Sequence, residues 1–212
     1  MSKSKLILIG GGGHCKSCID VIEMQDKYRI AGIVDLSKNI GNKVLGYPVI
    51  GCDDDMEQLS KSYSHFFITL GQIRDYSKRK EIFEKLVSLK NNIPVIISPL
   101  AYVSKHSKIG AGSIIMHYAV VNAEASIGLN CIINTHSLIE HDAEIGNHCH
   151  ISTGAIVNGG VKIGNCSFFG SGAVSKECIE IGSNSLVAAG AVAVNDIGDN
   201  QKVFGLPAKE KH

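Results

Sequence analysis

A histidine with a carboxylate on each side is the strongest candidate for chemistry in this chain. The segment Ile139-Glu140-His141-Asp142 places His141 two residues after a branched apolar residue and between two acids. A carboxylate beside an imidazole raises its basicity and fixes which ring nitrogen carries the proton. A general base that takes a proton from an amine or a hydroxyl during acyl transfer needs both properties. We therefore predict that His141 acts as a general base.

A glycine-rich run near the amino terminus is the second candidate. Gly10–His14 reads Gly-Gly-Gly-Gly-His and stands between a short apolar segment and a helical pattern. Such a backbone lets a phosphate approach closely, and the start of the helix offers free N–H groups and partial positive charge. The dinucleotide pattern G-x-G-x-x-G fails at Cys15, so we favour a nucleotide-phosphate site over an NAD site. Asp35 is placed to hydrogen-bond a ribose or a base, and His14 to touch the ligand or cap the helix. The alternative is a tight turn without a ligand.

A six-residue repeat predicts the element that presents His141. Steps of six from Val103 to Ala193 give sixteen positions, of which thirteen hold Ile or Val. Ile-Gly pairs recur every eighteen residues from Ile109-Gly110 to Ile181-Gly182. Three hexapeptides would form one triangular coil, with the branched side chains inside and strands of successive coils about 4.8 Å apart. We expect a parallel β-helix of about five coils, with each glycine where the backbone turns sharply.

The first hundred residues instead predict strands that alternate with helices, which is typical of an α/β unit with a parallel sheet. Such sheets bind ligands beyond the carboxyl ends of their strands, here at the glycine run, Asp35 and Gly71. We predict an α/β domain over residues 1–98 and a β-helix domain over residues 99–212. One helix is expected to follow the glycine run and end near Gln25, and another to span Asp75–Lys90. The expected strands are Lys5–Ile9, Ile30–Val34, Pro48–Ile50, His65–Leu70 and Pro94–Ile97.

Composition narrows the class of protein. The formal net charge is +1 over 212 residues, and without long basic runs this argues against nucleic acid as the main partner. The first apolar run is too short for a signal peptide, and no stretch approaches the ~20 apolar residues of a membrane helix. We expect a cytoplasmic protein without a membrane partner. Cys15 and Cys18 form a C-x-x-C for which redox or zinc chemistry is conceivable, but small apolar residues on a helix face are the better interpretation.

The order of these motifs resembles that of a known enzyme family, the nucleotide-amino-sugar N-acetyltransferases of the left-handed β-helix superfamily. Relatives of this type act in bacillosamine and perosamine synthesis, and sialic acid O-acetyltransferases share the layout. The motifs that carry the resemblance are Gly10–His14, Asp35, the hexapeptide repeat, Ile133-Asn134-Thr135, Ile139–Asp142 and Gly205-Leu206-Pro207-Ala208-Lys209. The resemblance implies a Rossmann-like nucleotide-sugar-binding domain followed by a left-handed parallel β-helix.

The activity that the resemblance implies is transfer of an acetyl group from acetyl-CoA to the amine of a nucleotide-linked 4-amino-dideoxy sugar, for surface-glycan (polysaccharide) biosynthesis. His141 would accept the amine proton and Asp142 would orient it, with no metal and no acyl-enzyme. The protein would be a homotrimer. The residues expected to bind the nucleotide sugar are Gly12, Gly13, His14, Asp35, Gly71 and Asn134. The residues expected to line the acetyl-CoA groove between subunits are His150, Gly159, Ser171, Ala189, Pro207 and Ala208.

Two departures from the family pattern stand out. Gln72-Ile73 follows Gly71 where the family often has Asn, and Ser171–Cys178 replaces a commoner proline-containing turn. The choice among UDP, GDP and dTDP stays open because recognition of the nucleobase depends on a few side chains. The choice between N- and O-acetylation stays open because a hydroxyl acceptor needs the same general base.

Two other functions are compatible with parts of the sequence. A γ-class carbonic anhydrase would use His136 and His141 as zinc ligands, but the position of the expected third ligand is Leu100. A non-catalytic solenoid would have no use for an acid-flanked histidine. Both therefore explain less of the sequence than an acetyltransferase does.

Overall fold

The computed structural model describes residues 3–73 and 75–210, which form two compact units. The first unit runs to Gly71 and resumes over Ser77–Ile96. The second consists of a connector from Gln72 to Tyr76 and of the chain from Ile97 onward. The chain therefore crosses from one unit to the other three times, and the connector is the short excursion between the first two crossings.

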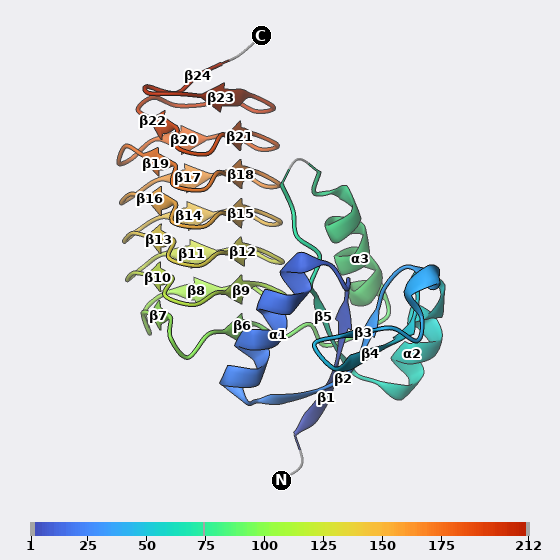
Figure 1. Ribbon diagram of the computed structural model, residues 1–212. Helices are drawn as coiled ribbons and strands as arrows, with labels where there is room; N and C mark the ends of the chain where they lie inside the picture. Colours follow the sequence, from blue (N-terminus) through green and yellow to red (C-terminus); the bar gives the residue numbers. More distant parts are fainter. Residues whose placement is uncertain (1–2, 74, 211–212) are drawn as a thin grey trace. The chain divides into compact units, whose positions relative to one another are not determined.

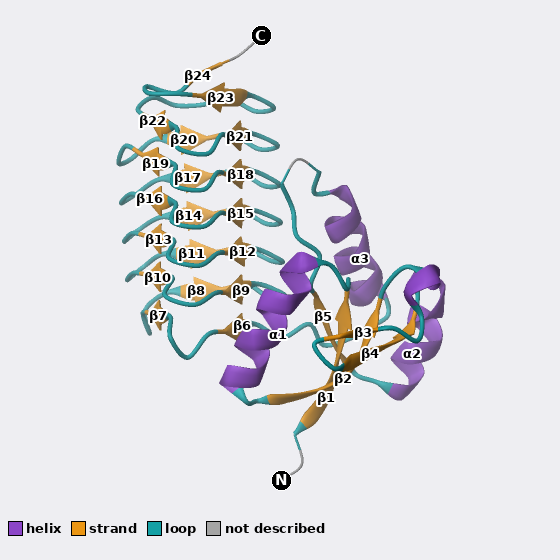
Figure 2. Cartoon of the chain, in the orientation of Figure 1, coloured by secondary structure: helices purple, strands orange, loops and turns teal. Residues whose placement is uncertain are grey.

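The first unit is built on a five-stranded sheet with the order β3-β4-β2-β1-β5 (Figure 2). The inner strand β1 has four consecutive buried residues at its carboxyl end, because helices cover both faces of such a sheet and leave no side of the strand in water. The β1–β2, β1–β5 and β2–β4 pairs are parallel, and β3 is antiparallel to β4. The strands are β1 (Ser4–Ile9), β2 (Tyr28–Val34), β3 (Lys43–Val44), β4 (Tyr47–Gly51) and β5 (His65–Ile68).

The helices of this unit are α1 (Gly13–Gln25), α2 (Met56–Ser62) and α3 (Ser77–Ser88), with 3-10 turns at Ser37–Asn39 and Asp53–Asp55. Cys15 and Cys18 lie on the buried face of α1, which confirms their interpretation as apolar helix residues. The short helix α2 was not predicted, because Met56 is its only buried residue and no apolar period marks it. The helices of the described chain are all too short or too polar to traverse a bilayer.

The second unit is a left-handed parallel β-helix, as predicted, with short strands of two or three residues stacked in three columns (Figure 1). One column, sheet D, contains β7 (Tyr102–Val103), β10 (Val120–Val121), β13 (Leu138–Ile139), β16 (Ile156–Val157), β19 (Val174–Ser175) and β22 (Val192–Ala193). The next, sheet E, contains β8 (Lys108–Ile109), β11 (Ser126–Ile127), β14 (Glu144–Ile145), β17 (Lys162–Ile163) and β20 (Glu180–Ile181). The last, sheet C, contains β6 (Ile96–Ile97), β9 (Ile114–Ile115), β12 (Ile132–Ile133), β15 (His150–Ile151), β18 (Phe168–Phe169), β21 (Leu186–Val187), β23 (Lys202–Phe204) and β24 (Lys209–Glu210).

The core of the β-helix is the stack of residues predicted from the six-residue repeat. Strands of neighbouring coils pair in parallel with a register of eighteen residues, so that Val121 lies beside Ile139 and Ile139 beside Val157. These three side chains have no exposed surface. The predicted inward stack is therefore confirmed. One predicted strand needs correction, since β6 lies at the edge of sheet C rather than in the sheet of the first unit.

The corners of the coils show why the Ile-Gly glycines are needed, and the reason differs from the one predicted. A Cβ added at Gly128 would stand 2.6 Å from the main-chain carbon of Gly146, so the glycine is required by the closeness of the next coil. Left-handed backbone occurs elsewhere, at every sixth residue from Gly112 to Gly190. Many of these positions are not glycine, and Asp142, with φ of 59°, is one of them. The catalytic candidate His141 therefore precedes a left-handed corner residue.

Candidate functional site

His141 stands on the corner between sheets D and E, directly after β13 and Glu140. Its Nδ1 and Oδ2 of Asp142 are 2.7 Å apart, and the two side chains are 65% and 63% exposed in the single chain. The hydrogen bond to Asp142 raises the pKa of His141 above its usual value. Because Nδ1 donates to Asp142 in this arrangement, Nε2 is the nitrogen left to take a proton. The structure thus joins the two residues predicted to be catalytic.

Glu140 supports the same corner without touching the imidazole ring. Its Oε2 accepts hydrogen bonds from Nδ2 of Asn122 at 2.8 Å and from the main-chain N–H of His141 at 3.2 Å. Glu140 thereby ties the corner to the preceding coil, and the His141–Asp142 pair stands on a fixed backbone. On the other side, the His141 ring lies against Gly159 of the next coil. The structure therefore also joins Gly159, predicted to line the cofactor groove, to the predicted base.

Asn134 and His150 form a second group, on another corner. Asn134 follows β12 at the corner between sheets C and D, one side of the prism away from His141. Its Nδ2 lies 3.2 Å from Nε2 of His150, and Nδ1 of His150 hydrogen-bonds to the carbonyl of Gln72. Within one chain, Asn134 is therefore a partner of His150 rather than of His141. Its predicted contact with the acceptor stays a prediction.

The remaining predicted cofactor residues lie higher along the solenoid. Ser171 and Ala189 are exposed on the same corner as Asn134, and the Ser171 hydroxyl hydrogen-bonds to that of Ser152 at 2.8 Å. Pro207 is exposed, whereas Ala208 packs on the core and donates its N–H to the carbonyl of Val192 at 2.8 Å. Ser171 and Ala189 thus share one edge of the prism with Asn134.

The predicted nucleotide residues of the first unit gather at the carboxyl ends of its strands. A Cβ added at Gly11 would stand 2.7 Å from Oδ2 of Asp35, and one added at Gly71 would stand 3.5 Å from Cβ of His14. Cβ atoms added at Gly12 and Gly13 would meet nothing within 4 Å. A cavity of about 260 Å³ opens beside them. Its lining residues are Ile9, Gly10, Gly12, Val34, Asp35, Leu36, Asp53, Leu70, Lys78 and Ile82.

Comparison with known proteins relates both units to one family. The sequence profile described as the PglD N-terminal domain matches residues 5–86. The chain is 34% identical to the acetyltransferase domain of PglB from Neisseria gonorrhoeae FA1090, with a TM-score of 0.90 over 99% of this chain and 100% of that one. It is 32% identical to the H141N mutant of perosamine N-acetyltransferase from Caulobacter crescentus in complex with CoA and GDP-perosamine, with a TM-score of 0.93 over 100% and 98%.

The chain belongs to the nucleotide-sugar N-acetyltransferases of the hexapeptide-repeat family. The enzyme is accordingly an acyltransferase, as predicted. WeeI from Acinetobacter baumannii AYE shares the fold at 22% identity, with a TM-score of 0.86 over 99% of this chain and 100% of that one. Comparison with curated protein sequences gave no match.

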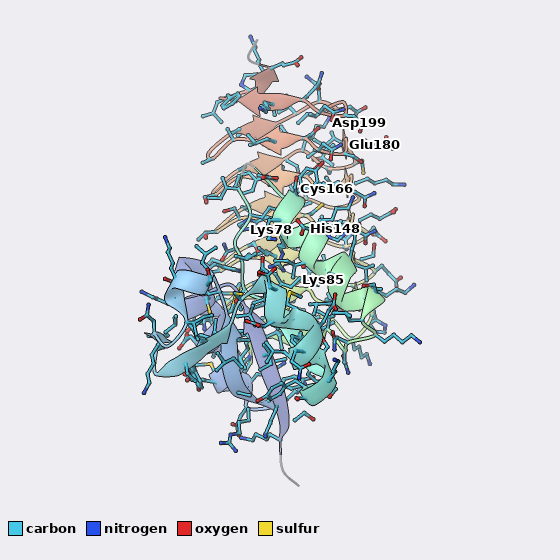
Figure 3. The ribbon with its side chains drawn as sticks, turned by 90° about the vertical axis from the view of Figure 1, so that its right-hand side faces the viewer. Lys78, Lys85, His148, Cys166, Glu180 and Asp199 are labelled. Carbon is cyan, nitrogen blue, oxygen red and sulfur yellow. The ribbon has the colours of Figure 1, made fainter. Side chains whose placement is uncertain are left out.

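Sequence reasoning missed one residue of these sites and the contact made by another. Lys78, in the first turn of α3 (Figure 3), lines the cavity of the first unit and pairs with Asp53 at 2.9 Å. The hydrogen bond to Asp53 raises the pKa of Lys78. Gln72 was noticed as a departure from the family pattern, but its contact with His150 joins residues too far apart in sequence for any local pattern to reveal.

The zinc alternative gains nothing from the geometry. The His136 ring stacks on Tyr118 with 5.0 Å between ring centres and an interplanar angle of 12°. His136 follows β12 and His141 follows β13, so the two histidines occupy different corners of the prism. In residues 3–73 and 75–210, no group of three or more His, Cys, Asp or Glu side chains is arranged to hold a metal ion. The described side chains offer zinc no complete set of ligands.

Proposed function

We propose that this enzyme transfers the acetyl group of acetyl-CoA to the amine of a nucleotide-linked 4-amino-dideoxy sugar. The observation that most directly supports this function is the 2.7 Å hydrogen bond between His141 and Asp142 on an exposed corner of the β-helix. The Caulobacter relative was crystallised with CoA and GDP-perosamine, and the Neisseria domain with acetyl coenzyme A. These complexes support the same two classes of substrate for this chain. Such a reaction would serve surface-glycan biosynthesis.

The chemistry of the transfer assigns one step to His141. The amine nitrogen of the sugar attacks the thioester carbonyl carbon, a C–N bond forms, and the C–S bond breaks. Nε2 of His141 takes the proton that the amine loses. The imidazolium then gives this proton to the CoA thiolate that leaves, so CoA departs as the thiol and His141 returns to its neutral form. The Asp142 carboxylate keeps Nδ1 protonated and stabilises the imidazolium that forms. The products are the acetamido sugar and CoA, and the enzyme itself is not acetylated.

The first unit supplies the features that a nucleotide sugar needs. Gly12 and Gly13 have open space where side chains would stand, so a diphosphate can approach the backbone at the start of α1. Asp35 offers carboxylate oxygens to ribose or base hydrogens, beside the apolar wall of Val34 and Ile82. Together with Gly71 and His14, these residues make the carboxyl edge of the sheet the proposed nucleotide-sugar site.

A second copy of the chain is the proposed partner of sheet D. The outward positions of this sheet are uniformly apolar, whereas those of sheet E include Lys108, Glu144, Lys162 and Glu180. An apolar column that water partly reaches is typical of an interface. The outward residues of sheet D are Tyr102, Val120, Leu138, Ile156, Val174 and Val192. We propose a homotrimer in which this face packs near the His141 corner of each subunit and the acetyl-CoA groove lies between subunits.

Two experiments test the proposal. A panel of UDP-, GDP- and dTDP-linked 4-amino sugars is incubated with the protein and acetyl-CoA, and CoA release is measured. The same panel with hydroxyl in place of the amine distinguishes N- from O-acetylation. We expect CoA release with at least one amino sugar and no CoA release with the hydroxyl analogue of that sugar. Release with the hydroxyl sugars alone would replace the proposal with O-acetylation, and failure of every acceptor would refute it.

The oligomeric state is tested separately by analytical ultracentrifugation. The wild type is expected to sediment at the mass of three chains. Ile156→Glu puts a charge in the middle of the apolar column and is expected to give monomer, whereas Lys162→Glu on sheet E should leave the trimer intact. A wild-type monomer that is fully active would contradict the inter-subunit site.

A further inference from the structure

A chain of hydrogen bonds enters the solenoid from the connector at Gln72 and passes through His150. The main-chain carbonyl of Gln72 is bonded to Nδ1 of His150, and Nε2 of the same ring is bonded to Nδ2 of Asn134 at 3.2 Å. The exposed fractions of Gln72 and His150 are 3% and 6%, so water has little access to these bonds. The His150 ring also meets Phe168 edge-on, with 5.2 Å between ring centres. The imidazole is thus held on both nitrogens and on one face.

Main-chain groups at the two ends fix the direction of every bond in this chain. The N–H of Thr135 can only donate, and it donates to Oδ1 of Asn134 at 2.8 Å, which turns the amide nitrogen of Asn134 toward His150. The carbonyl of Gln72 can only accept, so Nδ1 of His150 carries a proton. Nε2 then holds the lone pair that accepts from Asn134. A neutral His150 protonated on Nδ1 satisfies all three bonds at once.

The Gln72 side chain holds the accepting carbonyl in place. Its Nε2 donates to the main-chain carbonyl of His148 at 2.7 Å, in the turn that leads into β15 and two residues before His150. Gln72 therefore makes two bonds to one short segment, one with its side chain and one with its backbone. A residue that contacts the segment in this way fixes the distance between its own carbonyl and the His150 ring.

We infer that Gln72 is a positioning residue that sets the tautomer of His150 and, through it, the orientation of the Asn134 amide. The Asn134 side chain uses one amide hydrogen for His150 and its oxygen for the N–H of Thr135. Its second amide hydrogen is thereby directed to donate to an oxygen atom of the substrates. For its catalytic consequence this inference rests on the proposed acetyl transfer. Loss of a residue that orients a polar group in this way should lower activity about 10- to 100-fold, by analogy with the hydrogen-bond partners of metal-bound histidines.

The tautomer of His150 is measured directly by long-range ¹H–¹⁵N NMR of protein labelled with ¹⁵N-histidine. The protein is used without ligands, in the oligomeric state in which it is isolated. His150 is assigned by the resonances that disappear in His150→Gln. The wild-type ring is expected to show a protonated Nδ1 and a bare Nε2 at mildly alkaline pH. A proton on Nε2, on both nitrogens, or shared between tautomers would overturn the inference.

Two substitutions test the assigned partners. Gln72→Met keeps the length of the side chain but removes the donor to His148. It is expected to mix the two tautomers of His150 and to lower kcat about 10-fold, with little change in the KM for acetyl-CoA. Asn134→Asp puts a carboxylate against Nε2 and is expected to draw a proton onto that nitrogen. Gln201→Met is the matched control, because it removes a glutamine amide elsewhere in the solenoid, and it should change neither spectrum nor kcat.

The outcomes separate this inference from the proposed function. An unchanged His150 spectrum in Gln72→Met or in Asn134→Asp would overturn the inference, whatever the activity. If Gln72→Met does not fold, the wild-type spectrum and Asn134→Asp decide. A wild type that shows the expected tautomer but releases no CoA with any acceptor would refute the acetyl transfer and leave the assignment of Gln72 standing.

Discussion

The imidazole of His141 lies against the bare backbone of Gly159, the residue that stands eighteen positions later at the same corner of the next coil. A Cβ added at Gly159 would stand 2.9 Å from both Cε1 and Nε2 of the ring. Real Cβ contacts are longer than this, so the observed position of the imidazole requires glycine at 159. Asp142 fixes the ring through Nδ1, and Gly159 leaves the space that the ring occupies.

Gly159→Ala should therefore displace the proposed base without unfolding the protein. The His141 side chain is exposed and can move away from the added methyl group, so stability should change little. A displacement of the reacting atom by about 1 Å can cost about 10²-fold in rate. We expect kcat to fall by about that factor, as measured by CoA release. Glu177→Ala, at the same corner one coil further on, is the control, and equal activity of both variants would contradict the assigned contact.

His141→Ala removes the base altogether. Loss of a general base lowers kcat by ~10²–10⁴, and the exposed position of the side chain means that folding should be intact. His106→Ala removes another exposed histidine of the solenoid and should retain full activity. The two variants are compared by kcat and by thermal unfolding. Near-normal turnover of the His141 variant would exclude this residue as the base.

Asp142 should control the pH dependence of the reaction through the pKa of His141. The hydrogen bond to Asp142 raises the pKa of the imidazole, so the base form is lost at a higher pH than in an unpaired histidine. In Asp142→Asn that pKa falls, and the acid limb of kcat/KM should move to lower pH. At the same time kcat should decrease because the ring is less well oriented. Comparison of the two profiles on one acceptor cancels the titration of the substrate amine, and an acid limb that stays in place would contradict the role of Asp142.

The β-helix could be predicted because each inward residue is specified by its own hexapeptide. Val121 and Ile139 pair across coils, yet the repeat that places them is visible within a few residues of each. The closeness of successive coils could not be seen in this way, and the role of Gly128 was therefore misjudged. Strand β6 was assigned to the wrong sheet for the same reason, since its two residues form a strand only through a distant partner.

In the candidate site, too, contacts between neighbours in sequence could be predicted and contacts between distant residues could not. His141 and Asp142 are neighbours in sequence, so their pairing was predictable from the sequence. The contact between Gln72 and His150 joins residues separated by 78 positions, and no local pattern records it. Asn134 was assigned to the acceptor by resemblance, whereas the fold gives it His150 as its partner within the chain.

Gly13→Val tests whether the glycine run binds the nucleotide sugar. A Cβ at Gly13 would meet nothing within 4 Å in the protein, so the larger side chain should be tolerated by the fold. The same open space is where the diphosphate is proposed to lie. We expect the KM for the nucleotide sugar to rise at least about 10-fold, since each 1.4 kcal/mol of lost binding is tenfold, while acetyl-CoA binding is unchanged. Lys16→Val, on the exposed face of the same helix, is the control. Unaltered sugar affinity in Gly13→Val would make the run only a turn.

Gly128→Ala tests the packing of successive coils. The added methyl group would lie 2.6 Å from the main-chain carbon of Gly146 and 2.7 Å from the nitrogen of Asn147, and neither backbone atom can yield without shifting its coil. Overpacking of this kind costs about 1–3 kcal/mol in the free energy of unfolding. Urea unfolding should show that loss, whereas Lys108→Ala, an exposed change in the preceding coil, should stay within about 0.5 kcal/mol of the wild type. Equal stability of Gly128→Ala and the wild type would show that successive coils are further apart than these distances. The Gly159 backbone and the His141 ring, which lie on successive coils, would then also be further apart.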